Sequence, residues 1–190
     1  MSRLAKSVGF CAACGLVATA LLDCSSSSTG ASSSGVACSS ISPDAATTTD
    51  PDTCYPDNDG INNETYTIEI AVNDTGFTST GGDDDAGAKN IIATQNDSEV
   101  TLKLVNNGTK PHGFKVGCVS VCSSYPTLPA GCSPMACFPS NSTIAPIMPG
   151  ASATITFDTP TPDGLIYPFS SSAPDDGNVP GLNQGQWSLM

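Results

Sequence analysis

The chain has little positive charge, a single histidine and no apolar segment of membrane-spanning length. Its 190 residues include 6 Lys and Arg against 18 Asp and Glu, which leaves a formal net charge of −12 at pH 7. Proteins that bind nucleic acids place Lys and Arg patches against the phosphates, so this composition disfavours a nucleic-acid partner. A surface this acidic suits solubility, and it also suits a cationic ligand or partner.

The one extended apolar run lies at the N-terminus, from Val8 to Leu22, and it follows Arg3 and Lys6. A transmembrane helix needs about 20 apolar residues, so the run is short for a span. A basic start followed by a short apolar core is typical of an export signal. We therefore predict a signal peptide over residues 1–23, with a short buried helix as the alternative.

Two processing sites compete at the end of this run. Ala18-Thr19-Ala20 satisfies the small-x-small rule for ordinary signal cleavage. Leu21-Leu22-Asp23-Cys24 resembles a bacterial lipobox, which implies lipidation of Cys24, and the Ser-rich tract that follows is typical of a flexible tether. We predict a lipoprotein whose Cys24 anchors it in membrane lipid at the bacterial cell envelope, in the periplasm or on the outer surface. Cleavage after Ala20 would instead give a secreted protein.

Six of the nine cysteines remain once the signal peptide and Cys24 are set aside. An even number of cysteines in an exported chain predicts up to three disulfides. We favour a Cys38–Cys54 bond, because both residues precede the compact region. The remaining four would then staple one loop. An alternative is a thiolate metal cluster, because two cysteine pairs superficially resemble zinc ligands, but export favours disulfides. Those four residues are Cys118, Cys122, Cys132 and Cys137.

The composition divides the mature chain into a low-complexity linker over residues 24–61 and an all-β domain over residues 62–190. Large apolar residues alternate with polar ones at 66–72, 100–104 and 153–157, which is typical of half-buried strands. Further short strands are expected at 112–116, 165–169 and 186–189. Asn107-Gly108 is a strong hairpin signal between two of the strands. Residues 117–150 are expected to form an irregular, Cys-stapled loop, and the whole pattern predicts a β-sandwich.

His112 is the only histidine, so it is the only good nitrogen ligand for a metal. Ser, His and Asp are all present, which makes a hydrolase triad formally possible. The Gly-x-Ser-x-Gly turn that exposes a nucleophilic serine in many hydrolases does not occur in the sequence. We therefore predict that the protein is not an enzyme.

Three short elements stand in order along the domain: Asn106-Asn107-Gly108 with Pro111-His112, the strand from Gly164 to Ser171, and Gly181-Leu182-Asn183-Gln184-Gly185 before a closing strand. Together they resemble the cupredoxin family, the small blue-copper sandwiches that include plastocyanin and azurin. The resemblance extends from about Tyr66 to Leu189. It implies a Greek-key β-sandwich with His112 at the position of the first copper ligand.

The same resemblance places Ser171 at the copper-ligating Cys of the family, Asp176 at the second His and Leu182 at the axial Met. A blue-copper site requires a thiolate and two imidazoles with a weak axial ligand. A serine hydroxyl, a carboxylate and a hydrocarbon are poor substitutes. We therefore expect no cofactor, and we predict a cell-envelope binding or structural lipoprotein whose partner is an unknown protein or small molecule.

Two roles for His112 remain open in the sequence. Its ring nitrogens could bond to the loop backbone or to Asp176, as a structural histidine. Alternatively, His112 and Asp176, with Met135 or Met148 as a thioether ligand, could bind copper at a non-standard site for metal handling or electron transfer.

Overall fold

The computed structural model describes residues 35–43, 54–55, 64–83 and 89–190. The chain divides into two compact units, 1–32 and 33–190, and every described residue belongs to the second. The predicted signal peptide, Cys24 and most of the predicted linker lie outside the described residues. No helix among the described residues has the length and apolar character needed to cross a bilayer.

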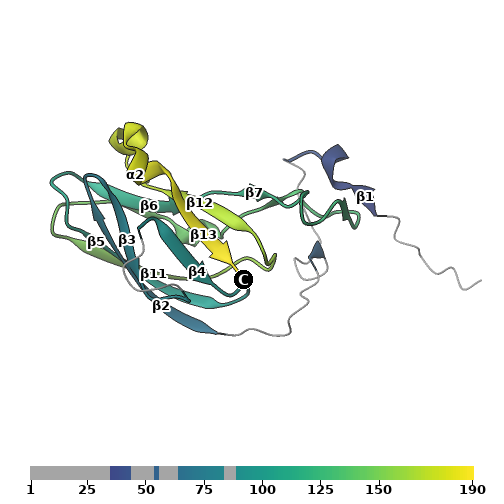
Figure 1. The fold of residues 1–190 in the computed structure, drawn as a ribbon, viewed down its shortest axis with the longest axis horizontal. Coiled ribbons are helices and arrows are strands. Elements are labelled where there is room, and N and C mark those ends of the chain that lie inside the picture. Colours follow the sequence, from purple (N-terminus) through teal and green to yellow (C-terminus); the bar gives the residue numbers. More distant parts are fainter. Residues whose placement is uncertain (1–34, 44–53, 56–63, 84–88) are drawn as a thin grey trace, which may run out of the picture. The chain divides into compact units, whose positions relative to one another are not determined.

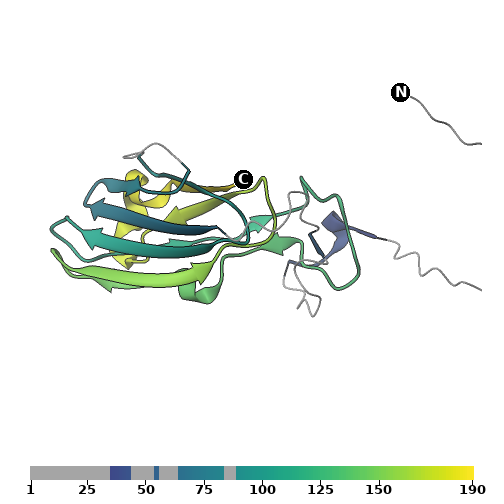
Figure 2. The ribbon, with the colours of Figure 1, turned by 90° about the horizontal axis from the view of Figure 1, so that it is seen from below.

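Two β-sheets form the core of the domain (Figures 1 and 2). The five-stranded sheet has the order β10 (Ile144–Ile147), β6 (His112–Val116), β12 (Ile166–Ser170), β13 (Gly185–Leu189) and β4 (Ile91–Thr94). The four-stranded sheet has the order β11 (Ser152–Asp158), β5 (Glu99–Asn106), β2 (Thr65–Asn73) and β3 (Gly76–Thr80). The pairs β2–β5 and β13–β4 are parallel and the other pairs are antiparallel.

The alternation of apolar and polar residues along the strands explains how the sheets face each other. In β2, the side chains of Tyr66, Ile68, Ile70 and Val72 are buried, whereas their neighbours are exposed or half-buried. β5 shows the same period of two. Because successive side chains in a strand point to opposite faces, each sheet buries one face. The predicted all-β sandwich is therefore confirmed.

Aromatic rings fill the space between the two sheets. Trp187 is fully buried, and its ring centroid lies 5.0 Å from that of Phe138 and 6.3 Å from that of Phe114. Its indole Nε1 donates a hydrogen bond to Thr94 Oγ1 at 2.9 Å, so the polar atom of this large side chain has a partner in the core.

The six predicted strands are present, but the hairpin predicted at Asn107-Gly108 is wrong. β5 and β6, which this turn separates, belong to different sheets, so the chain crosses the sandwich here. Gly108 instead lets the backbone pass close to the side chains of Asp74 and His112. A Cβ at this position would lie 2.6 Å from both Asp74 Oδ1 and His112 Nε2. β3 and β4 were not predicted, because β3 has a single large apolar residue, Phe77, and β4 buries three consecutive residues without alternation.

The disulfide prediction is correct in number and wrong in pairing. The bonds are Cys38–Cys122, Cys54–Cys132 and Cys118–Cys137. Both N-terminal cysteines bond to the long loop and not to each other, because β1 (Val36–Ala37) pairs with β8 (Thr127–Leu128) and the Tyr55 ring packs on Tyr125. Described parts of the predicted linker therefore belong to the compact unit.

The remaining elements are short. β7 (Val119–Ser120) pairs with β9 (Met135–Ala136), and 3-10 turns η1 (Cys38–Ser40), η2 (Ser140–Ser142) and η3 (Pro174–Asn178) and helix α2 (Pro180–Asn183) complete the domain. We call residues 35–43, 54–55 and 117–139 the Cys-stapled region. The predicted loop over 117–150 is largely irregular, but its last part, β10, joins the edge of the five-stranded sheet.

Candidate functional site

His112 begins β6 and is buried in the end of the sandwich, with 1 % of its surface exposed. The strand starts here because Pro111, which has no amide hydrogen, ends the preceding turn. Figure 1 shows α2 at the end of the sandwich where β6 begins. Three segments that are distant in sequence meet at this end: the β2–β3 turn, the start of β6, and η3 with α2.

Both ring nitrogens of His112 have a carboxylate partner. Nδ1 lies 2.8 Å from Asp176 Oδ2, and Nε2 lies 2.9 Å from Asp74 Oδ1. Asp176 is buried in η3, whereas Asp74 is half-buried in the β2–β3 turn. The histidine therefore links two separate loops through the start of a core strand.

The two carboxylates favour the protonated imidazole. Burial is the largest single influence on His112 and opposes the charged form, but the hydrogen bonds and charges of Asp176 and Asp74 together outweigh it. They hold the pKa of His112 above its usual value of 6.5. An imidazolium with two N–H donors satisfies both carboxylates at once. We define His112, Asp74 and Asp176 as the His112 clamp.

Asp74 is held in place by the crossover between the two sheets. Its Oδ2 accepts a hydrogen bond from Thr109 Oγ1 at 2.6 Å, and its Oδ1 accepts one from the Thr109 amide at 2.9 Å. The hydrogen bond from the Thr109 hydroxyl has the largest influence on Asp74, and the hydrogen bond from His112 has the second largest. Together they hold the pKa of Asp74 far below its usual range. Sequence reasoning missed Asp74. Its only signal is its place in an Asn-Asp-Thr-Gly turn, a common turn composition.

The structure brings together the positions that the resemblance assigned to copper ligands. Ser171 Oγ accepts hydrogen bonds from the amides of Gly113 at 3.3 Å and Ala173 at 3.1 Å. The Ser171 amide donates to the Leu182 carbonyl at 2.8 Å, and the Leu182 side chain is fully buried. Asp176 thus bonds to His112 itself, Ser171 bonds to the next residue, Gly113, and Leu182 bonds to Ser171.

The two methionines considered as ligands lie elsewhere or point outward. Met135 lines a cavity beside Asp158, which pairs with Glu99 at the start of β5, whereas His112 follows the end of β5. Met148 follows Ile147, the residue paired with His112, but 65 % of its surface is exposed. Met135 is therefore not brought to His112.

The donor set does not fit a blue-copper centre. A metal needs a free lone pair on an imidazole nitrogen, and both nitrogens of His112 are engaged with carboxylates. The neighbouring Ser171 hydroxyl accepts two amide hydrogens, and Leu182 offers only hydrocarbon. Over the described part of the chain, no group of three or more His, Cys, Asp or Glu side chains has an arrangement able to hold a metal ion.

Comparisons with known proteins find similarity at the level of structure. No protein-family model matches the chain, and no curated protein does. A dithionite-reduced auracyanin of Roseiflexus castenholzii is 18 % identical over 69 % of this chain and 99 % of its own, with a TM-score of 0.41. Auracyanin A, a "blue" copper protein of Chloroflexus aurantiacus, is 18 % identical over 66 % of this chain and 99 % of its own, with a TM-score of 0.40.

A multicopper oxidase is also similar, at 16 % identity over 80 % of this chain and 53 % of its own, with a TM-score of 0.40. The two-sheet arrangement of the described residues is the β-sandwich that the resemblance to cupredoxins implied. The similar structures include auracyanins as well as a multicopper oxidase. Similarity this distant says nothing about activity.

Proposed function

We propose that this protein is an exported binding lipoprotein whose cupredoxin-like domain carries the His112 clamp in place of a blue-copper centre. The observation that supports this most directly is the pair of hydrogen bonds from His112 to Asp176 and Asp74, at 2.8 and 2.9 Å. A protonated imidazole that donates a hydrogen bond from each ring nitrogen has no free lone pair with which to coordinate a metal.

The clamp has a structural role that a metal would otherwise supply. Burying an unpaired charge is costly, whereas a buried imidazolium between two carboxylates is paired on both sides. The clamp ties the β2–β3 turn and η3 to the start of β6, which are separated in sequence by 38 and 64 residues. It thereby closes the end of the sandwich without a cofactor.

Three disulfides support export, because such bonds persist in oxidising compartments. Anchoring through Cys24 is the finer part of the proposal. Mass spectrometry of the mature N-terminus tests it directly. A lipid-modified Cys24 would support the anchor, and an unmodified N-terminus at Leu21 would contradict it.

Incubation of the protein with Cu(II) tests whether it lacks a blue-copper centre. The purified domain is incubated with Cu(II), dialysed, and analysed for bound copper and for visible absorption. We expect less than one copper per chain and no intense thiolate-to-copper band. Retention of one copper per chain that is lost in His112→Ala would contradict the proposal and favour a non-standard copper site.

A matched variant shows whether the scaffold itself can hold copper. Ser171→Cys, Asp176→His and Leu182→Met together would restore a thiolate, a second imidazole and a thioether around His112. We expect this triple variant to bind one copper with an intense visible band. Failure of the folded variant to do so would contradict the assignment of these three positions.

A further inference from the structure

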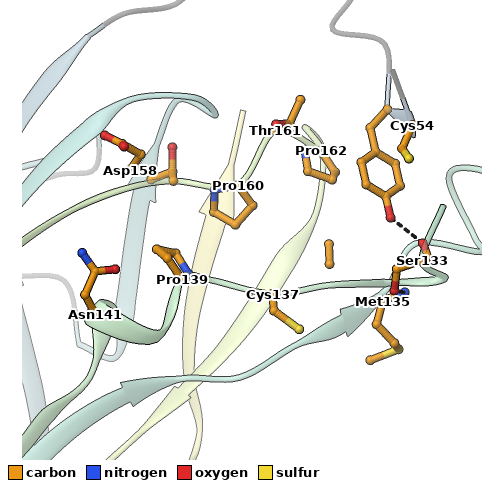
Figure 3. Close-up of a pocket in the computed structure, with 13 residues that line it drawn as sticks. Cys54, Ser133, Met135, Cys137, Pro139, Asn141, Asp158, Pro160, Thr161 and Pro162 are labelled. Carbon is orange, nitrogen blue, oxygen red and sulfur yellow. Dashed lines mark hydrogen bonds between the residues drawn. The ribbon is translucent and has the colours of Figure 1, made fainter. Parts of the chain in front are cut away.

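A cavity of about 400 Å³ lies away from the His112 clamp, and none of the clamp residues lines it. Its walls come from residues 54–55, from residues between 133 and 141, and from residues 158–162, which connect β11 to β12. Figure 3 shows Asp158 and Asn141 on one side of the cavity and Ser133, Met135 and Cys54 on the other. Pockets for small molecules have volumes of about 300–1,000 Å³, so this cavity has a suitable size.

The walls of the cavity are mainly apolar. Pro139, Pro160 and Pro162 contribute their rings, and the side chains of Tyr55 and Met135 line another part. Proline rings and a thioether present hydrocarbon and sulfur surface with few hydrogen-bonding groups. The cavity therefore favours a ligand with an apolar body.

Covalent bonds hold this apolar wall in shape. Cys54 and Cys137 line the cavity and belong to the Cys54–Cys132 and Cys118–Cys137 disulfides. The Tyr55 hydroxyl donates a hydrogen bond to the Ser133 carbonyl, and its ring centroid lies 5.4 Å from that of Tyr125. A site that is already ordered loses less entropy when a ligand binds.

The charge at the rim of the cavity is negative. Asp158 is exposed, and its side chain has no hydrogen bond or ion pair within the described ranges. It lies directly opposite Glu99 in the β11–β5 ladder. Like charges facing each other across a ladder are destabilising, and no Lys or Arg occurs among the described residues that line the cavity. A cation bound here would relieve this repulsion.

The cavity is distinct from the His112 clamp. The rim residue Asp158 pairs with Glu99 at the start of β5, whereas Asn106 ends β5 and bonds through its side chain to the Lys110 carbonyl just before His112. Eight residues of strand separate the two sites, or about 23 Å. A ligand in the cavity therefore does not contact His112.

We propose that this cavity binds a small organic cation with an apolar body, such as an arylalkylamine. The apolar body contacts the proline, tyrosine and methionine wall, and the ammonium group lies beside Asp158 and Glu99. This inference rests on the binding role proposed above and names the class of ligand.

Three probes with the same apolar body separate charge from shape: 4-phenylbutylamine, 4-phenylbutanol and 4-phenylbutyrate. Titration of the whole domain, followed by amide chemical shifts and calorimetry, measures affinity and location together. We expect the amine to bind most tightly, the alcohol more weakly and the carboxylate weakest. The shifted amides should lie in residues 133–141 and 158–162.

Two variants separate the contribution of charge to the affinity from the contribution of apolar contact. Asp158→Asn should weaken the amine about two- to fivefold at low salt and leave the alcohol unchanged, because an exposed ion pair contributes little. Met135→Ala should weaken the amine and the alcohol alike by about fivefold, because it removes apolar contact. Glu69→Gln, which changes the net charge equally but lies at the Lys103 ion pair, is the matched control and should have no effect.

Equal affinity for the amine and the alcohol would overturn the proposal, as would tighter binding of the carboxylate. Shifts mapping away from the cavity, or no saturable binding at millimolar concentrations, would also overturn it. The copper experiment remains a separate measurement. Retained copper would contradict the metal-free function, and its result does not depend on whether the amine binds.

Discussion

The β-sandwich and the Cys-stapled region are stabilised by different interactions. The sandwich has strands of up to nine residues and a β2–β5 ladder of eight residue pairs over a fully buried core. The Cys-stapled region has two ladders of two pairs each and contains both cysteines of every disulfide. A segment too small to bury a core of its own depends on covalent links, whereas the sandwich depends on burial.

We expect the largest effect from removing the disulfide that lies beside the cavity. Cys54→Ser combined with Cys132→Ser should lower the free energy of unfolding by about 2–4 kcal/mol, because the bond closes a loop of 78 residues. Urea unfolding measures the loss. Hydrogen exchange should become faster in the Cys-stapled region while the β2 and β5 amides remain protected.

The Cys38–Cys122 bond supplies a matched comparison, since it closes a loop of 84 residues and neither cysteine lines the cavity. Replacing both of these by Ser should cost similar stability but affect amine binding less. Equal loss of protection in β2 and β5 for either pair would show that the two regions unfold as one.

A second effect concerns the His112 clamp, which belongs to the sandwich and uses no covalent link. The pKa of His112 is raised in the folded state, so its contribution is complete below about pH 6.5 and is lost as the pH rises through the folded value. The pKa of Asp74 is lowered, so its contribution is present above 3.8 and is lost as the pH falls further. We expect maximal stability between these limits.

His112→Gln should lower the free energy of unfolding by about 2 kcal/mol near pH 6 and flatten its decline above pH 6.5. Urea midpoints measured from pH 4 to pH 9 test this. Glu69→Gln, at an exposed ion pair, should change stability by less than about 1 kcal/mol and leave the slope unaltered. An unchanged slope in His112→Gln would refute the charged clamp.

The smallest effect lies where the two regions approach each other. The Tyr167 hydroxyl is fully buried and has no hydrogen-bond partner among the described residues, and burial, together with Tyr55 and Tyr125, raises its pKa. Tyr167→Phe should therefore raise the free energy of unfolding by about 1 kcal/mol, because it removes a buried polar atom without a partner.

Tyr66→Phe is the control for this change, because the Tyr66 hydroxyl bonds to Glu64 and Asp83 at 2.6 and 2.8 Å. In urea unfolding, Tyr66→Phe should lose stability whereas Tyr167→Phe should gain it. Destabilisation of Tyr167→Phe by a comparable amount would show that its hydroxyl has a partner in solution.

Strands whose side chains alternate strongly could be predicted from the sequence, and weakly patterned ones could not. Tyr66 to Val72 carries a full period-two pattern and lies in β2 as expected, whereas Ile91–Thr94 buries three consecutive residues and gives no alternation. The Asn107-Gly108 hairpin was a sound local expectation. It is wrong because Gly108 is needed where the crossover approaches Asp74 and His112.

The candidate site was predictable only in part, for a similar reason. His112, Ser171, Asp176 and Leu182 could be placed together through their order along the chain. Asp74 could not, since a half-buried turn aspartate resembles any other until the sandwich folds. The cavity wall likewise joins Cys54 and Tyr55 to residues more than 70 positions away.

The order of residues alone determines the class of this domain: alternating side chains dictate a two-sheet sandwich because each strand must bury one face. It also determines that His112 has no second imidazole and no thiolate at the positions of the copper ligands, so that its ring nitrogens bond to other groups. The tertiary structure decided which cysteines bond and which carboxylates hold His112. It also decided where an apolar cavity opens beside an acidic rim. Those contacts join segments distant in the chain, and local sequence carries no information about their meeting.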